Sequence, residues 1–199
     1  MGISGVKFDY ETSVVSQKQF NAHIKLYDGY VENFNKIERD KNSLTAEELG
    51  GANTTYSAAR NVGTSETFAL DAVILHELYF ENLGDSECKR SEKVDEILSK
   101  NFGGVSEFSA KFKAAGLAAR GWVVLAYSFR AESCNIFAQD AHDAGVVHES
   151  RPLLVLDMYE HAYFLDYATD KGAYIDNFLL GVNWAKVAER AAKLQSLLG

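Results

Sequence analysis

Cysteine is scarce in this sequence, because Cys88 and Cys134 are the only two among 199 residues. Two cysteines so far apart in the chain do not suggest the disulfide framework of a small secreted domain. Long apolar runs are missing too, since none reaches the ~18 residues expected of a membrane-spanning helix. No basic stretch followed by an apolar one opens the chain. We therefore expect a soluble, cytoplasmic protein that makes no membrane contact.

Basic residues are outnumbered as well. Lys and Arg total 20 against 28 Asp and Glu, which gives a formal net charge of −8. This balance argues against a nucleic-acid-binding protein, and an anionic substrate would need local attraction rather than attraction by the whole molecule. Apolar residues, in contrast, make up 47% of the sequence. That share predicts a globular protein with a sizeable core.

Two long helical patterns occupy the first part of the chain. Apolar residues recur at helical spacing from about Gln17 to Arg39, and Ser16 with Gln19 has the spacing of a capping box at the start of this helix. A second pattern, from Ser65 to Leu83, is apolar nearly all round, so we expect this helix to be buried. A polar, turn-rich segment separates the two, which predicts a helical hairpin whose return arm begins around Thr55 or Thr64.

The rest of the chain changes its pattern twice. Two shorter amphipathic helices are expected at 92–100 and 105–115, three strands rich in β-branched and aromatic residues at 121–129, 133–139 and 151–156, and closing helices at 177–198. This order predicts an α+β fold. We expect an N-terminal helical hairpin domain over residues 1–84 and a C-terminal α/β domain with a three-stranded antiparallel sheet over residues 85–199.

The residues most suggestive of chemistry follow the third expected strand. Its apolar run ends at Asp157, where an isolated carboxylate would be costly without a cation or several hydrogen-bond donors. His161 follows four residues later, so a helix or a tight turn would bring the two side chains together. A carboxylate with an imidazole suits a first-row metal such as Mn or Fe. The alternative is that Asp157 caps a helix with Glu160 in its first turn, while His161 packs in the core.

Two more histidines lie on the long helices. His23, Tyr27 and Tyr30 fall on one face of the first helix at steps of four and three residues. His23 has the common alternative of a half-exposed helix residue. His76 lies in the middle of the expected buried helix, and a buried histidine needs a partner for both ring nitrogens.

The segment from Asp157 to Tyr163, Asp-Met-Tyr-Glu-His-Ala-Tyr, closely resembles the metal-binding signature of the iron/manganese superoxide dismutases, Asp-x-Trp-Glu-His-Ala-Tyr. Further segments resemble that family in the same order along nearly the whole chain: Tyr30-Val31-x-Asn33-x-Asn35, Leu75-His76-Glu77-Leu78-Tyr79-Phe80, Gly121-Trp122, Gln139-Asp140 and Val182-Asn183-Trp184. The resemblance implies the same layout, a helical hairpin followed by an α/β domain around three strands.

By this resemblance the metal ligands are His76, Asp157, His161 and a histidine on the first helix. The usual spacing to Tyr30 falls on Ala22, whereas alignment from Ser16 onward falls on His23. The absence of a π-bulge, which adds one residue to a helix, would account for the difference. We therefore predict His23 as the fourth ligand of one Mn or Fe ion per subunit; the sequence is compatible with either metal.

The resemblance also implies roles for residues around the metal. Tyr30 would stand at the mouth of the site and relay protons, and Gln139 would hydrogen-bond the metal-bound solvent and so tune the redox potential. Glu160 would reach across a two-fold axis to the ligand histidine of a partner. The remaining residues expected at the metal pocket or the dimer interface are Trp122, Met158, Tyr159 and Tyr163.

Several positions depart from the family pattern. The second gateway histidine of the family corresponds to Leu26 or Tyr27, and its tryptophan before Glu-His is Tyr159. The arginine often found after the signature has no clear match; Lys171 or Lys25 would supply its charge, unless each is a solvated surface lysine. The loop histidines of the second half, His142 and His148, receive no ligand role.

The function implied by the resemblance is superoxide dismutation, which converts superoxide to oxygen and hydrogen peroxide at a mononuclear Mn or Fe centre. Superoxide would be the small anionic substrate, and the protein a homodimer, with a tetramer also compatible. The alternative is a metal-binding homodimer on the same fold with low activity or none. A helical interaction module without metal would require three histidines and an aspartate to match by accident.

Overall fold

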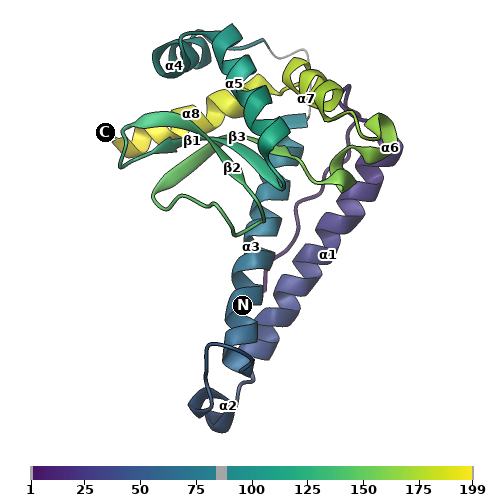
Figure 1. Ribbon diagram of the computed structural model, residues 1–199, viewed down its shortest axis with the longest axis vertical. Coiled ribbons are helices and arrows are strands. Elements are labelled where there is room, and N and C mark those ends of the chain that lie inside the picture. Colours follow the sequence, from purple (N-terminus) through teal and green to yellow (C-terminus); the bar gives the residue numbers. More distant parts are fainter. Residues whose placement is uncertain (1, 84–88, 199) are drawn as a thin grey trace.

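The computed structural model describes residues 2–83 and 89–198. Two long helices, α1 (Gln17–Asn42) and α3 (Ala58–Leu83), lie side by side as an antiparallel hairpin, with the short α2 (Ala46–Gly50) at its far end (Figure 1). The predicted hairpin is confirmed. Helix α3 starts at Ala58, between the two expected starts at Thr55 and Thr64, because the hydroxyl of Ser57 accepts a hydrogen bond from the backbone N–H of Arg60 at 3.2 Å and caps the helix there.

Half of the predicted capping box of α1 is present. Ser16 is the N-cap, and its hydroxyl oxygen accepts the backbone N–H of Gln19 at 3.2 Å. The side chain of Gln19 does not return to the backbone N–H of Ser16. That group donates instead to a carboxylate from another element, Asp166 Oδ2, at 2.6 Å. A tertiary contact thus replaces the local one.

Helix α3 is not buried all round, so that expectation is wrong. It contacts α1, α2, the third strand of the sheet, β3 (Ser150–Asp157), and the last helix, α8 (Trp184–Leu198). Phe68 and Ile74 are 38% and 42% exposed. The buried side of α3 is formed by Ala69, Ala72, Val73, Leu75, His76, Tyr79, Phe80, Asn82 and Leu83.

The second half contains two helices, α4 (Glu92–Phe102) and α5 (Val105–Ala118), followed by a three-stranded sheet. Its strands are β1 (Trp122–Ser128), β2 (Ser133–Gln139) and β3 (Ser150–Asp157). The order is β2-β1-β3 and both pairings are antiparallel, which confirms the predicted α+β fold and its sheet. Strand β1 is central and almost wholly buried, which explains its continuous apolar sequence.

The sheet places the end of β3 beside the start of β1. Trp122 is paired with Gln139 on one side and with Asp157 on the other. Directly paired residues point to the same face of a sheet, so these three residues form one row. The row is kept tight by Gly121, where an added Cβ would lie 3.0 Å from the carbonyl oxygen of Gln139.

After β3 the chain forms a one-turn 3-10 helix, η1 (Glu160–Ala162), then α6 (Phe164–Tyr167), α7 (Lys171–Leu180) and α8 (Trp184–Leu198). The closing helices therefore begin at Lys171 rather than Asn177. The side chain of Asp170 accepts the backbone N–H of Ala173 at 2.9 Å and caps α7 at this earlier point.

A side chain of helix α8 forms hydrogen bonds to both α3 and β3. The guanidinium of Arg190 donates to Asn82 Oδ1 at 2.7 Å and to the carbonyl of Leu153 at 2.9 Å, and the amide of Asn82 donates to the carbonyl of Val155 at 2.8 Å. The predicted domain boundary between residues 84 and 85, like Cys88, lies outside the described residues. Within residues 2–83 and 89–198, no helix is both long and apolar enough to cross a membrane.

Candidate metal centre

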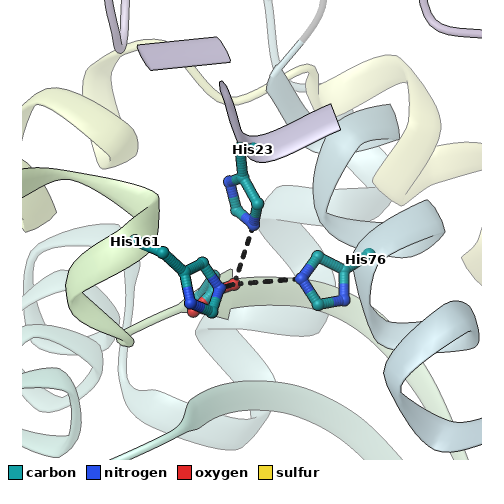
Figure 2. A group of neighbouring side chains, drawn as sticks. His23, His76 and His161 are labelled. Carbon is teal, nitrogen blue, oxygen red and sulfur yellow. Dashed lines mark hydrogen bonds and ion pairs between the residues drawn. The ribbon is translucent and has the colours of Figure 1, made fainter. Parts of the chain in front are cut away.

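Four polar side chains from four separate elements meet between the hairpin and the sheet. His23 comes from α1, His76 from α3, Asp157 from the end of β3 and His161 from η1, and each offers a ligand atom within 4.8 Å of the others. Figure 2 shows the three histidines directed toward one another around a common point. Three of the side chains are buried, whereas that of His161 is 27% exposed.

One carboxylate oxygen lies at the centre of this group. Asp157 Oδ2 is 3.1 Å from His23 Nε2, 3.7 Å from His76 Nε2 and 3.2 Å from His161 Nε2. Two atoms that ligate one ion at about 2.1 Å lie roughly 3–4 Å apart, so these distances suit a shared cation. The other oxygen, Oδ1, accepts the backbone N–H of Tyr159 at 2.8 Å. The capping alternative for Asp157 is wrong, because the N-cap of the helix that contains Glu160 is Tyr159 and no side chain caps that helix.

The hydrogen bonds of His76 show which of its nitrogens is free. Nδ1 lies 2.6 Å from the carbonyl of Ala72, and because a carbonyl only accepts, Nδ1 carries the hydrogen. Burial, followed by the neighbouring His23, lowers the pKa of His76 to about 3, so the ring is neutral and Nε2 bears a lone pair. A carbonyl-anchored imidazole of this kind is a common metal ligand.

Two buried nitrogens lack a hydrogen bond. Among the described residues, His23 Nε2 and His76 Nε2 are buried side-chain atoms without a hydrogen-bond partner, although both face Asp157. Buried polar atoms are nearly always paired. Burial is also the main cause of the lowered pKa of His23. A bound cation would give both nitrogens a partner, and the lone pair on Nε2 of His76 already faces the carboxylate, so these residues fit a metal ion.

Asp157 remains ionised in this setting. Its burial alone would raise the pKa of the carboxyl group, but the contacts with His161 and His23 outweigh that effect and hold the pKa below its ordinary range. The cluster therefore offers one negative charge together with imidazole nitrogens. This donor set suits a divalent or trivalent first-row metal.

A second chain of hydrogen bonds runs beside the cluster. The indole Nε1 of Trp122 donates to His142 Nδ1 at 3.0 Å, and His142 Nε2 lies 2.9 Å from the hydroxyl of Tyr30. An indole only donates, and burial lowers the pKa of His142 to about 4, so the neutral ring carries its hydrogen on Nε2 and donates it to Tyr30. The ring centroid of Tyr30 is 5.2 Å from that of His76.

The comparisons with known proteins agree with this site. Residues 90–190 match the family model for iron/manganese superoxide dismutases, C-terminal domain. The chain is 34% identical to a superoxide dismutase [Fe] of Aquifex aeolicus over 181 residues, which covers 90% of this chain and 85% of the relative. The chain belongs to the iron/manganese superoxide dismutase family. It is also 31% identical to superoxide dismutase [Mn] 1 of Halobacterium salinarum, over 84% of this chain and 82% of the relative.

In this member of the iron/manganese superoxide dismutase family, α1 brings His23 to the cluster. Helix α1 is continuous from Gln17 to Asn42, and Ala22 is exposed on it. Tyr27 is fully buried, and its hydroxyl donates to Glu77 Oε1 at 2.7 Å and accepts the backbone N–H of Val6 at 2.8 Å. Its hydroxyl is therefore engaged away from the cluster.

Aromatic rings surround the cluster. The rings of Trp122 and His76 meet edge to face with centroids 5.0 Å apart, and Tyr159 stacks on His161 at 5.2 Å. Met158 is 1% exposed and follows Asp157 directly. Tyr163 is buried within the subunit and stacks on Tyr174 at 5.0 Å.

Gln139 lies in the same row of the sheet as Trp122 and Asp157. Its side-chain oxygen is buried and is the third such atom without a hydrogen-bond partner among the described residues. No described contact joins it to the cluster, and the indole of Trp122 donates to His142. Its predicted role therefore stays a prediction.

The position of His142 could not be predicted from the sequence. This residue lies in the loop after β2, whose turn-forming composition indicates exposure, yet it is only 1% exposed. The loop forms a tight turn, because Asp140 donates its N–H to the carbonyl of Ala144 at 3.1 Å and Gly145 adopts a φ of 100°. The other loop histidine, His148, is exposed.

The charge expected of Lys171 or Lys25 stays a prediction. Lys25 is exposed on α1, and Lys171 is the first residue of α7. A third lysine, Lys36, lines a cavity of about 560 Å³ together with Tyr30 and Phe68. This cavity offers an approach to the hydroxyl of Tyr30.

Proposed function

We propose that this protein is a superoxide dismutase that holds one Mn or Fe ion per subunit through His23, His76, Asp157 and His161. The observation that carries this proposal is the buried cluster, in which three imidazole nitrogens lie around one carboxylate oxygen. Relatives named for iron and for manganese over most of the chain support the same activity.

The bound ion would supply one-electron chemistry, oxidising one superoxide to oxygen and reducing a second one. The four side chains fix the position of the ion, and the surrounding rings limit the access of water. His23, His76 and Asp157 are at most 2% exposed, so the ion would sit in a nearly dry pocket. Reduction of superoxide to hydrogen peroxide also consumes two protons per molecule, which this pocket must deliver.

Tyr30 would hold such a proton in this proposal. Since His142 donates to its hydroxyl oxygen, Tyr30 keeps its own hydroxyl hydrogen for another acceptor. Burial and the charge of Asp157 raise the pKa of Tyr30, so the hydroxyl stays protonated near neutral pH. Tyr30 would donate toward the cluster, with His142 and Trp122 fixing its orientation. Gln139 remains the alternative donor in this proposal.

The approach of superoxide would depend on local charge. The whole protein carries a formal charge of −8, which disfavours an anion. Lys36 stands in the cavity beside Tyr30, although its ammonium also pairs with Asp40 at 2.5 Å. The cavity would therefore guide the anion by its shape and by a partly neutralised lysine.

The proposal also includes an oligomeric state and a location in the cell. Glu160 is exposed on η1 next to the partly exposed His161, so a second subunit could bring its own glutamate to this ligand in a homodimer, or in a tetramer built from such dimers. A cytoplasmic location would suit the unpaired thiol of Cys134. The division into domains at 1–84 and 85–199 belongs to the proposal as well.

One observation favours the alternative of a metal-binding protein with low activity or none. Tyr27 stands near the position of the second gateway histidine of the family, and its hydroxyl is bound to Glu77 and to the backbone of Val6. A tyrosine held in this way does not carry protons to the mouth of the site.

Metal analysis and an activity assay test the two functions together. The protein should be purified, its Mn and Fe content measured, and superoxide disproportionation assayed for each metal form. The proposed function requires about one ion per subunit and turnover by at least one metal form. Full metal content without turnover would establish the alternative.

A further inference from the structure

Gln19 connects the first helix to the turn that carries His161. It lies on α1 one turn before His23, on the same face, and its side chain is 1% exposed. Its amide nitrogen Nε2 donates to the carbonyl oxygen of His161 at 2.5 Å, and its oxygen Oε1 accepts the backbone N–H of Leu165 at 3.0 Å. Since one partner only accepts and the other only donates, they fix the orientation of the amide.

The two backbone groups held by Gln19 are four residues apart. In an uninterrupted α-helix, the N–H of Leu165 would donate to the carbonyl of His161. Here the chain changes from η1 to α6 between them, and the amide of Gln19 bonds to both groups. The side-chain amide thus takes the place of a direct backbone hydrogen bond between the two groups, and it fixes the geometry of the turn.

A second contact to the same region comes from Ser16, the N-cap of α1. Ser16 donates its hydroxyl to Asp166 Oδ1 at 2.7 Å and its backbone N–H to Asp166 Oδ2 at 2.6 Å. Asp166 belongs to α6, which directly follows the turn that carries His161. Two residues at the start of α1 therefore hold the chain on the C-terminal side of this ligand.

His161 is the ligand with most need of such support. Its side chain is 27% exposed, and its backbone belongs to a helix of only three residues. His76, in contrast, sits within a helix of 26 residues and Asp157 at the end of a paired strand. We propose that Gln19 is a positioning residue that fixes His161 relative to His23 for metal binding. This inference rests on the proposed metal site.

Replacement of Gln19 by leucine tests this role. Gln19→Leu keeps similar bulk but removes both hydrogen bonds, and Gln17→Leu is the matched control, because Gln17 is exposed and bonds only to Asn21 within α1. The dissociation constant for Mn²⁺ should be measured by electron paramagnetic resonance of free Mn²⁺. We expect Gln19→Leu to raise it at least tenfold and Gln17→Leu to change it less than twofold.

The decisive comparison uses His161→Ala as a second background. If Gln19 acts through His161, then Gln19→Leu should change the Mn²⁺ dissociation constant less than twofold once His161 is absent. An equal effect in both backgrounds, or no effect in the protein that retains His161, would overturn the proposal. Should Gln19→Leu not fold, Gln19→Glu makes the same test, because it keeps the acceptor for Leu165 and removes the donor to His161.

Affinity for Mn²⁺ is measured without turnover, so this test separates two failures. A protein that binds Mn²⁺ and loses affinity on Gln19→Leu, yet has no dismutase activity, would refute the proposed function and support the role of Gln19. An active protein whose Gln19→Leu variant binds Mn²⁺ as tightly as the original would do the reverse.

Discussion

His142 Nε2 lies 2.9 Å from the hydroxyl oxygen of Tyr30, although the two residues are 112 positions apart in the chain. The same imidazole accepts the indole N–H of Trp122 through its other nitrogen. Three elements thus meet in one line of hydrogen bonds beside the metal cluster. In a neutral ring only one nitrogen can donate, so the indole determines that the donor toward Tyr30 is Nε2.

Replacement of His142 should impair turnover without removing the metal. His142→Ala deprives the Tyr30 hydroxyl of its donor, and we expect at least a tenfold loss of superoxide turnover per bound metal, equivalent to ~1.4 kcal/mol. His142→Gln retains an N–H donor and should recover part of the rate. His148→Ala, at an exposed loop histidine, is the control and should keep full activity. Unchanged turnover in His142→Ala would remove His142 from the proton path.

Gln139→Leu tests the competing donor. If the amide of Gln139 bonds to metal-bound solvent, the variant should keep its metal, shift the resting oxidation state and lose at least tenfold in turnover, or ~1.4 kcal/mol. The measurements are metal content, visible spectrum and rate per bound metal. A variant that loses stability but keeps its spectrum and rate would leave Gln139 with a structural role at the end of β2.

His23→Ala should abolish stoichiometric metal binding while leaving most of the helix content intact. The ring of His23 supplies one of the two buried nitrogens without a hydrogen bond, so its loss opens the coordination of the ion. Elemental analysis reports the metal, and far-ultraviolet circular dichroism reports the helix. Lys25→Ala, at an exposed position on the same helix, should bind metal normally. Full occupancy in His23→Ala would show that another residue is the fourth ligand.

Metal removal should lower the thermal midpoint of unfolding. An ion at about 100 times its dissociation constant adds ~2.7 kcal/mol to the free energy of unfolding. In a protein of this size, 1 kcal/mol shifts the midpoint by roughly 2–4 °C, so we expect a fall of about 5–10 °C. Calorimetry with and without Mn²⁺ measures it, and His23→Ala should show no such difference. An equal shift in that variant would place the stabilising ion elsewhere.

Glu160→Ala should weaken dimerisation and metal retention together. Glu160 is exposed on the single subunit beside a ligand, which is the arrangement expected of a residue that completes its contacts in a partner. Sedimentation velocity measures the assembly, and metal analysis after dialysis measures retention. Glu96→Ala on α4, whose side chain is 69% exposed, is the control. A Glu160→Ala protein that stays dimeric and keeps its metal would refute this role.

Much of the fold follows from local patterns in the sequence. Apolar periodicity near 3.6 residues predicts α1 and α3, and β-branched and aromatic residues predict the three strands, because these signals arise within one element. The cap contacts that moved helix ends, such as Ser57 at α3 and Asp170 at α7, depend on single hydrogen bonds and are harder to predict. The exposure of Phe68 and Ile74 depended on which neighbours cover α3, and the sequence does not show this.

The family signature from Asp157 to Tyr163 determined the kind of site, and His76 followed from the cost of burying a histidine. Only the tertiary structure decided the contacts between distant segments. It brought His23, not Ala22, to the carboxylate, and it turned a loop so that His142 joins Tyr30 to Trp122. In the tertiary structure the side-chain amide of Gln19 also donates to the backbone carbonyl of His161, and the side chain makes no hydrogen bond to the backbone N–H of Ser16. Such contacts need two elements in register, and the spacing within one element does not contain that information.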